Sequence, residues 1–159
     1  MRLLSLPHVL IRDWPDEAAT TAAAAQLARC PGLNQALIVL NGDLGAGKTT
    51  FVRGLLRALG ATGRIKSPSY AVLESYALPG LQAHHFDFYR FTDPREWEDA
   101  GFRELLTGPG LKLVEWAGNA PGLMPAADLA LDIDPHGDGR RVQAKALTET
   151  GAQLLEAWA

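Results

Sequence analysis

One eight-residue segment constrains the fold of this chain more than any other feature. Residues 42–49 read Gly-Asp-Leu-Gly-Ala-Gly-Lys-Thr, which matches the pattern G-x-x-x-x-G-K-[ST] of loops that enclose the phosphates of a nucleoside triphosphate. The three glycines allow the left-handed backbone conformations that turn successive N–H groups toward one anion. The Lys48 ammonium can reach the β- and γ-phosphates, and the Thr49 hydroxyl is placed to bind Mg²⁺. The motif therefore predicts a nucleotide site.

The residues on either side of the loop support this interpretation. Before it, the apolar run 36–40 is rich in strand-forming residues, and after it residues 50–59 have apolar side chains at helical spacing. Gly60 is typical of the residue that follows a helix. The expected order is thus strand, loop and helix, and the loop lies at a helix N-terminus, where free N–H groups and the helix dipole favour an anion.

Length, charge and cysteine content narrow the possible classes of protein. A chain of 159 residues with 47% hydrophobic content predicts one domain, residues 1–159, around one core. A net charge of −3 does not favour binding of nucleic acid by charge alone. The single cysteine, Cys30, excludes an internal disulfide and favours a reducing cytosol, so we expect a cytoplasmic protein. No run approaches the roughly 20 apolar residues of a membrane span.

The start of the chain has one feature of a signal peptide, because the apolar segment 3–11 follows Arg2. Pro7 interrupts that segment, and acidic residues follow from Asp13 onward. We therefore expect a strand that enters a folded domain.

The remaining patterns predict alternating helices and strands. Residues 18–28 are rich in alanine and have helix start and stop signals at their ends. Two strand-like segments flank the Pro79-Gly80 turn and predict a hairpin. The expected elements are helices at 18–28, 50–59, 93–106 and 150–158, and strands at 36–40, 71–76, 81–89, 111–116, 129–133 and 141–146. Together they predict an α/β fold: a three-layer unit of the P-loop NTPase type, with a mainly parallel central sheet and antiparallel additions.

Phosphoryl chemistry on Mg²⁺ also needs carboxylates, and two lie on predicted strands. Alternation along residues 85–90 places His85, Asp87 and Tyr89 on one polar face. We expect Asp87 to belong to the metal or water shell; the alternative is a hairpin strand with a solvated face. Glu115 ends an apolar run, like the strand and acid that hold Mg²⁺ in such enzymes; the alternative is an ordinary strand-end carboxylate.

Two further features are open between two interpretations. The segment 67–69, Ser-Pro-Ser, is either a switch-like loop whose hydroxyls sense the γ-phosphate or simply a turn. Trp97, Trp116 and Trp158 are expected to be packing residues, with a surface for a partner as the alternative.

Four motifs, in this order and in so short a chain, resemble the bacterial family of the tRNA threonylcarbamoyladenosine biosynthesis protein TsaE, or YjeE-like proteins. They are the phosphate loop continued to Phe51, Lys-Ser-Pro-Ser-Tyr at 66–70, His-Phe-Asp-Phe-Tyr-Arg at 85–90 and Leu-Val-Glu-Trp at 113–116. The resemblance spans nearly the whole chain, including residues 15–20. Each later motif is modest alone, but the set is specific.

The resemblance implies a P-loop ATPase that uses ATP and Mg²⁺ and acts with TsaB and TsaD. Those proteins transfer a threonylcarbamoyl group to an adenosine beside the tRNA anticodon, and contact of this chain with tRNA would be indirect. Asp87 matches an acidic residue tied to hydrolysis, so Asp87 and Lys48 are the expected catalytic residues. Thr49 and Glu115 would be the Mg²⁺ ligands. The expected nucleotide-binding residues are Thr20, which would help enclose the adenine, Gly42, Asp43, Leu44, Gly45, Ala46, Gly47, Lys48, Thr49, Thr50 and Ser69.

Two positions depart from the family pattern. Ser69 stands where the family usually has Thr, which keeps the hydroxyl and loses a methyl group. Ala117-Gly118 follow the Glu-Trp pair where many relatives carry Pro and an acid.

The leading hypothesis is therefore an ATPase that serves as an accessory of a tRNA-modifying complex. The alternative from another class is an ATP-dependent small-molecule kinase, which needs an acceptor site and usually an arginine-bearing lid, and no clear lid segment lies between Asp93 and Gly110. A regulatory GTPase has less support, because the chain contains no Asn-Lys-x-Asp element.

Overall fold

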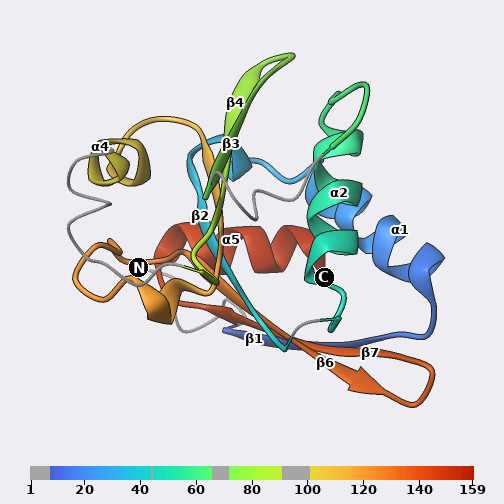
Figure 1. Ribbon diagram of the computed structural model, residues 1–159. Coiled ribbons are helices and arrows are strands. Elements are labelled where there is room, and N and C mark those ends of the chain that lie inside the picture. Colours follow the sequence, from blue (N-terminus) through green and yellow to red (C-terminus); the bar gives the residue numbers. More distant parts are fainter. Residues whose placement is uncertain (1–7, 44, 66–71, 91–100) are drawn as a thin grey trace.

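In the described part of the chain, seven strands form one mixed sheet through the middle of the molecule (Figure 1). The structure is a computed structural model, and it describes residues 8–43, 45–65, 72–90 and 101–159. The strands are β1 (Val9–Trp14), β2 (Leu37–Asn41), β3 (Leu73–Leu78), β4 (Leu81–Asp87), β5 (Leu111–Glu115), β6 (Leu129–His136) and β7 (Gly139–Ala146). Their order across the sheet is β1-β7-β6-β2-β5-β4-β3.

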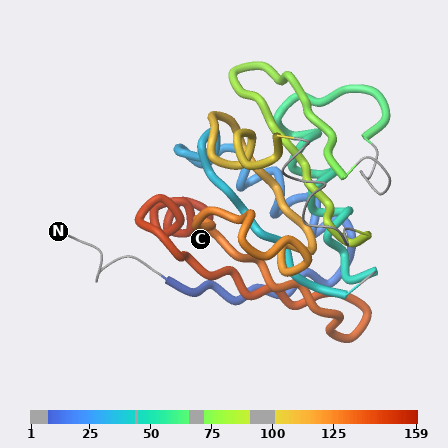
Figure 2. Tube along the Cα trace, turned by 60° about the vertical axis from the view of Figure 1, so that its left-hand side comes forward, coloured from blue at the N-terminus to red at the C-terminus, as the bar shows by residue number. Residues whose placement is uncertain are grey.

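The centre of the sheet is parallel and its edges are antiparallel. Strand β2 pairs in parallel with both β5 and β6, and β4 pairs in parallel with β5. Strands β3, β7 and β1 are added by antiparallel pairing, and Figure 2 shows β1 running along the β6–β7 hairpin at one edge. This arrangement confirms the predicted α/β fold, with a parallel centre and antiparallel additions. It also brings the carboxyl ends of β2, β4 and β5 together at one end of the sheet.

Helices cover both faces of the sheet. The described helices are α1 (Glu17–Leu27), α2 (Lys48–Ala58), α4 (Phe102–Thr107) and α5 (Glu149–Trp158), with short 3-10 turns η2 (Leu33–Gln35) and η3 (Ala117–Asn119). Helices α1 and α2 pack against each other on one side, and α4 lies on the opposite side (Figure 1). Of the helices in the described ranges, none has the length and apolarity needed to cross a membrane.

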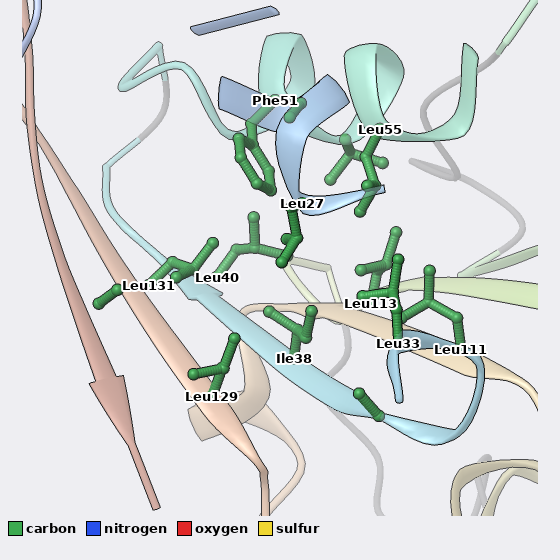
Figure 3. Close-up of a cluster of buried hydrophobic side chains, with 14 of the residues drawn as sticks. Leu27, Leu33, Ile38, Leu40, Phe51, Leu55, Leu111, Leu113, Leu129 and Leu131 are labelled. Carbon is green, nitrogen blue, oxygen red and sulfur yellow. The ribbon is translucent and has the colours of Figure 1, made fainter. Parts of the chain in front are cut away.

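Two hydrophobic cores lie on the two faces, and strand alternation explains the division. Along β2, Ile38 and Leu40 enter the larger core beneath α1 and α2 (Figure 3), and α5 also contributes to this core. Leu37 and Val39 belong to the smaller core beside α4. The smaller core contains the aromatic side chains Phe86, Phe88 and Phe102. A parallel strand between two layers of helices is usually apolar on both faces, and β2 accordingly begins with four consecutive apolar residues.

Most predicted elements are confirmed, with two differences. The predicted helix 93–106 is observed only as α4, beginning at Phe102; residues 91–100 lie outside the described residues. The first strand, expected within 3–11, is observed as β1 and extends to Trp14. Trp14 is buried and stacks on Phe51 of α2 with ring centres 5.4 Å apart, and this packing sets the end of the strand. Residues 1–7 lie outside the described part of the chain.

Candidate functional site

The glycine-rich loop joins β2 to α2, as the sequence predicts. Gly42 and Gly47 adopt φ values of 148° and 106°, which only glycine adopts at little cost. A Cβ atom at Gly42 would collide with the backbone oxygen of Ile133 on β6, so this position also requires glycine for space. Leu44 lies outside the described residues. The loop therefore passes close against the sheet and reaches the first turn of α2 at Lys48.

Lys48 is held inside the loop although its side chain is charged. The residue is 4% exposed, and its Nζ donates a hydrogen bond to the Gly42 oxygen at 2.6 Å. The same Nζ lies 4.1 Å from the centre of the Trp116 ring. Burial lowers the pKa of Lys48, and the nearby carboxylates of Glu115 and Asp87 partly oppose this effect. The ammonium group is thus placed between the loop and two acidic side chains.

The two predicted carboxylates lie side by side at the ends of neighbouring strands. Asp87 of β4 and Glu115 of β5 are register partners. Glu115 is buried, and its Oε2 is 2.6 Å from Nε2 of His85, a contact that holds the carboxylate in place. Asp87 Oδ1 accepts a hydrogen bond from the Tyr89 amide at 3.0 Å. Burial raises the pKa of Asp87, the Tyr89 hydrogen bond lowers it, and the charge of Glu115 raises it further.

The loop and the two carboxylates face one cavity of about 400 Å³. Its lining comes from four separate stretches of the chain. The lining residues are Gly45, Gly47, Lys48, Thr49, Thr50, Asp87, Tyr89, Arg90, Glu115, Trp116 and Arg140. Hydroxyl and carboxylate oxygens of this kind are the ligands that Mg²⁺ prefers, and the loop amides suit an anion. The residue set therefore fits a phosphate chain with a bound divalent cation.

A second cavity, of about 220 Å³, adjoins the first. Its lining includes Thr20 of α1, the residue expected near the adenine. Thr20 is 4% exposed, and its hydroxyl donates to the Asp16 backbone oxygen at 3.4 Å. Asp16 also caps α1 by accepting a hydrogen bond from the Ala19 amide at 2.8 Å. The complete lining is Trp14, Asp16, Glu17, Thr20, Gly47, Thr50, Asp138, Gly139 and Arg140.

Two residues of this site were not identified from the sequence in that role. Trp116, expected only to pack, has φ 58° just after β5, and its ring lies over Lys48 and 4.9 Å from the Tyr89 ring. Its position directly after Glu115 was the available signal. Arg140 is the second residue of β7, and its Nη2 donates to the Gly45 oxygen at 3.0 Å. No local pattern marks Arg140, because only the sheet order brings β7 beside the loop.

The other predicted residues divide between confirmed packing and untested positions. Trp158 packs as expected, with ring centres 6.5 Å from Trp14 and 6.0 Å from Phe51. Ser69 and the segment 67–69 lie outside the described residues, as does Trp97. Their roles stay predictions.

Comparisons with known proteins identify the family of this chain. Residues 14–143 match the family model described as threonylcarbamoyl adenosine biosynthesis protein TsaE. The tRNA threonylcarbamoyladenosine biosynthesis protein TsaE of Haemophilus influenzae is 40% identical over 122 residues, which cover 77% of each chain. The protein of that name from Bacillus subtilis is 37% identical over 127 residues, covering 80% of this chain and 77% of the relative. The crystal structure of Bacillus subtilis YdiB superposes with a TM-score of 0.79 at 28% identity, covering 94% of this chain and 93% of that one.

Proposed function

The chain belongs to the TsaE family, and from this premise we propose that it is a Mg²⁺-dependent ATPase that takes part in the threonylcarbamoyladenosine modification of tRNA. The observation that carries the proposal is the convergence of the phosphate loop, Lys48, Asp87 and Glu115 on one cavity. The named biosynthetic role of the relatives supplies the process in which the activity is used.

ATP would lie across the two adjoining cavities. Its phosphates would follow the loop into the larger cavity, where the loop amides and Lys48 are positioned to bind them. Its nucleoside would occupy the smaller cavity, beside Thr20. Thr50 and Gly47 line both cavities, so a single extended ligand can contact both.

The metal site would use Thr49 and Glu115. His85 holds one carboxylate oxygen of Glu115, and a carboxylate has a second oxygen with which to ligate a cation. Bound Mg²⁺ would neutralise charge on the phosphate oxygens. These oxygen donors satisfy the preference of a hard cation, so the chain fits the ion that the family resemblance implies.

Asp87 would orient the attacking water and accept its proton. Its burial raises the pKa of the carboxyl group, and a carboxylate with a raised pKa accepts a proton more readily than an ordinary one. The Tyr89 amide binds one oxygen of Asp87, which leaves the other oxygen to accept a hydrogen bond from water. Lys48 would stabilise the charge that develops on the transferred phosphoryl group.

The partners in this proposal are TsaB and TsaD, with tRNA contacted only indirectly. The family membership supports this assignment, and the net charge of −3 is consistent with it because a protein that holds tRNA by itself usually presents excess positive charge. A cytoplasmic location follows from the same role and from the single, buried Cys30.

Phosphate release from Mg·ATP tests the proposal directly. We would measure it for the purified chain alone and with TsaB and TsaD from the same organism, with Lys48→Met as the inactive control. We expect slow release by the chain alone and faster release with the partners. Binding of ATP without release under any of these conditions would contradict the ATPase assignment. Transfer of phosphate to an acceptor other than water would support a small-molecule kinase instead.

A further inference from the structure

Arg140 occupies the junction between the two cavities of the site. It is the first residue after Gly139 at the start of β7, on the hairpin that follows β6. Arg140, Gly47 and Thr50 line both the larger cavity with the carboxylates and the smaller cavity with Thr20. These three residues therefore form the passage through which a ligand that fills both cavities must run.

The guanidinium group of Arg140 is held by two hydrogen bonds, but one of its buried N–H groups has no acceptor in the described part of the chain. Nη1 donates to the Gly139 oxygen at 2.9 Å, and Nη2 donates to the Gly45 oxygen at 3.0 Å. Nε is buried and has no hydrogen-bond partner among the described residues. This Nε is close to Gly47, because a Cβ atom added to that glycine would lie 3.2 Å from it. A guanidinium has five N–H donors in a planar fork, so donors remain beyond the two that bind the Gly139 and Gly45 oxygens.

Apart from Arg140, the charged residues that line the smaller cavity are acidic. Asp16, Glu17 and Asp138 line that cavity, and Arg140 is the one basic residue in its lining among the described residues. Three acidic residues in the lining of this cavity would repel a phosphate group that approaches it. A cation at the passage reduces that repulsion where the ligand's negative charge comes closest to the carboxylates.

We propose that Arg140 binds the α-phosphate of the nucleotide. This assignment rests on the proposed function, because it takes the nucleoside to lie in the smaller cavity and the β- and γ-phosphates to lie with Lys48 and Thr49 in the larger one. The group between them is the α-phosphate, and Arg140 is the cation at that point. Arginine also suits a phosphate better than lysine does, because its fork can contact two oxygens at once.

Nucleotide affinity of Arg140 variants tests the assignment. Arg140→Met keeps the packing of the stem against Gly47 and removes the charge, and Arg140→Lys keeps the charge without the fork. We expect Arg140→Met to weaken the binding of ATP and of ADP by the same factor, about 10- to 100-fold, because both nucleotides carry the α-phosphate. Arg140→Lys should retain part of the affinity. Isothermal titration calorimetry measures the dissociation constants of ATP and ADP for the wild type and both variants.

The matched control is Arg141→Met. Arg141 is the next residue on the same strand, its side chain is 50% exposed, and its Nε pairs with Asp13 at 2.9 Å. Its loss should leave the dissociation constants of ATP and ADP unchanged.

A purely structural role for Arg140 would be to hold the loop in place through the Gly45 oxygen. The two diastereomers of ATP that carry sulfur on the α-phosphate distinguish this role from a direct contact with that phosphate. The wild-type protein should distinguish the diastereomers, and Arg140→Met should bring their affinities closer together. An unchanged ratio, a loss confined to ATP, or unchanged binding by Arg140→Met would each overturn the α-phosphate contact while the proposed function stands. Failure of the wild-type chain to bind ATP would instead overturn the proposed function and this assignment with it.

Discussion

Two buried lysines, at opposite ends of the parallel strands, have nearly the same local environment. Lys48 and Lys112 are each 4% exposed, and burial lowers the pKa of both. Each Nζ donates to a backbone oxygen, that of Gly42 at 2.6 Å and that of Gly108 at 2.7 Å. Yet Lys48 lines a cavity at the carboxyl ends of the strands, whereas Lys112 lies near the amino end of β5 and bonds to the residue that ends α4.

The two histidines of β4 show the same contrast between a residue of the candidate site and a residue outside it. His84 contacts the Ser75 hydroxyl at 2.8 Å on the neighbouring β3, and His85 contacts Glu115 at 2.6 Å beside the loop. Burial, a hydrogen bond and a shifted pKa are therefore not enough to identify a functional residue. The distinguishing property is convergence at the carboxyl ends of parallel strands, where strand ends leave room for a ligand between them.

The largest effect should follow from Asp87→Asn at the carboxyl end. The amide keeps the oxygen that accepts from Tyr89 but cannot take a proton, so we expect the rate of ATP hydrolysis to fall about 10²- to 10⁴-fold with little change in ATP affinity. The control is Glu74→Gln on β3, in register with His85 and outside both cavities. Turnover by Asp87→Asn equal to that of Glu74→Gln would make Asp87 a structural residue.

Replacement of each lysine by methionine tests the difference between Lys48 and Lys112 most directly. Lys48→Met should weaken ATP binding about 10- to 100-fold, because a charge-assisted contact to phosphate is lost. Lys112→Met should leave the dissociation constant unchanged, since Lys112 lines neither cavity of the site. Calorimetric titration with ATP compares the two variants. Equal losses would mean that the effect comes from burial of a lysine and not from its position.

Glu115→Gln should raise the Mg²⁺ concentration needed for half-maximal ATP hydrolysis by about tenfold or more, because a neutral amide is a weaker ligand than a carboxylate. Titration of Mg²⁺ at saturating ATP measures the change. Glu104→Gln, on the exposed side of α4, is the control and should titrate like the wild type. A wild-type titration curve for Glu115→Gln would remove Glu115 from the metal site.

Lys112→Met should lower the free energy of unfolding by about 1 kcal/mol, because the Gly108 oxygen at the end of α4 loses its donor. Urea denaturation measures this change. The result expected for the amino end of the strands is thus a loss of stability without a loss of ATP affinity. An unchanged free energy of unfolding would contradict a structural role for this hydrogen bond.

The smallest effect concerns the stability cost of the Asp87 charge. Because burial raises the pKa of Asp87 in the folded state, the folded protein binds this proton more tightly than the unfolded chain, and stability falls as pH rises from 3.8 through the raised pKa. Asp87→Asn should therefore unfold at a slightly higher urea concentration than the wild type at pH 7. The gain should disappear as pH falls below 3.8, where both side chains are neutral. A variant less stable than the wild type at pH 7 would contradict this sign.

The sequence by itself determined the elements whose signals are local. Glycine positions, turn residues and apolar spacing predict the loop between β2 and α2, the helix after it, the hairpin at Gly80 and the β6–β7 pair. The structure confirms these elements, whereas binding of phosphate by the loop stays a prediction. The end of β1 was wrong, and residues 93–100 of the predicted helix 93–106 lie outside the described residues. The position of Trp14 against Phe51 shows why, since a distant packing partner sets the strand's limit.

Only the tertiary structure decided how the site is assembled. Asp87 and Glu115 were each predicted as candidates, but their pairing in register depends on the order of β4 and β5 in the sheet. The His85–Glu115 contact, the Trp116 ring over Lys48 and the approach of Arg140 to Gly45 have the same origin. Local hydrogen bonding and periodicity can be recognised in the sequence because they involve residues close together in the chain. Contacts between distant segments depend on which strands become neighbours, and the packing of the whole sheet determines this.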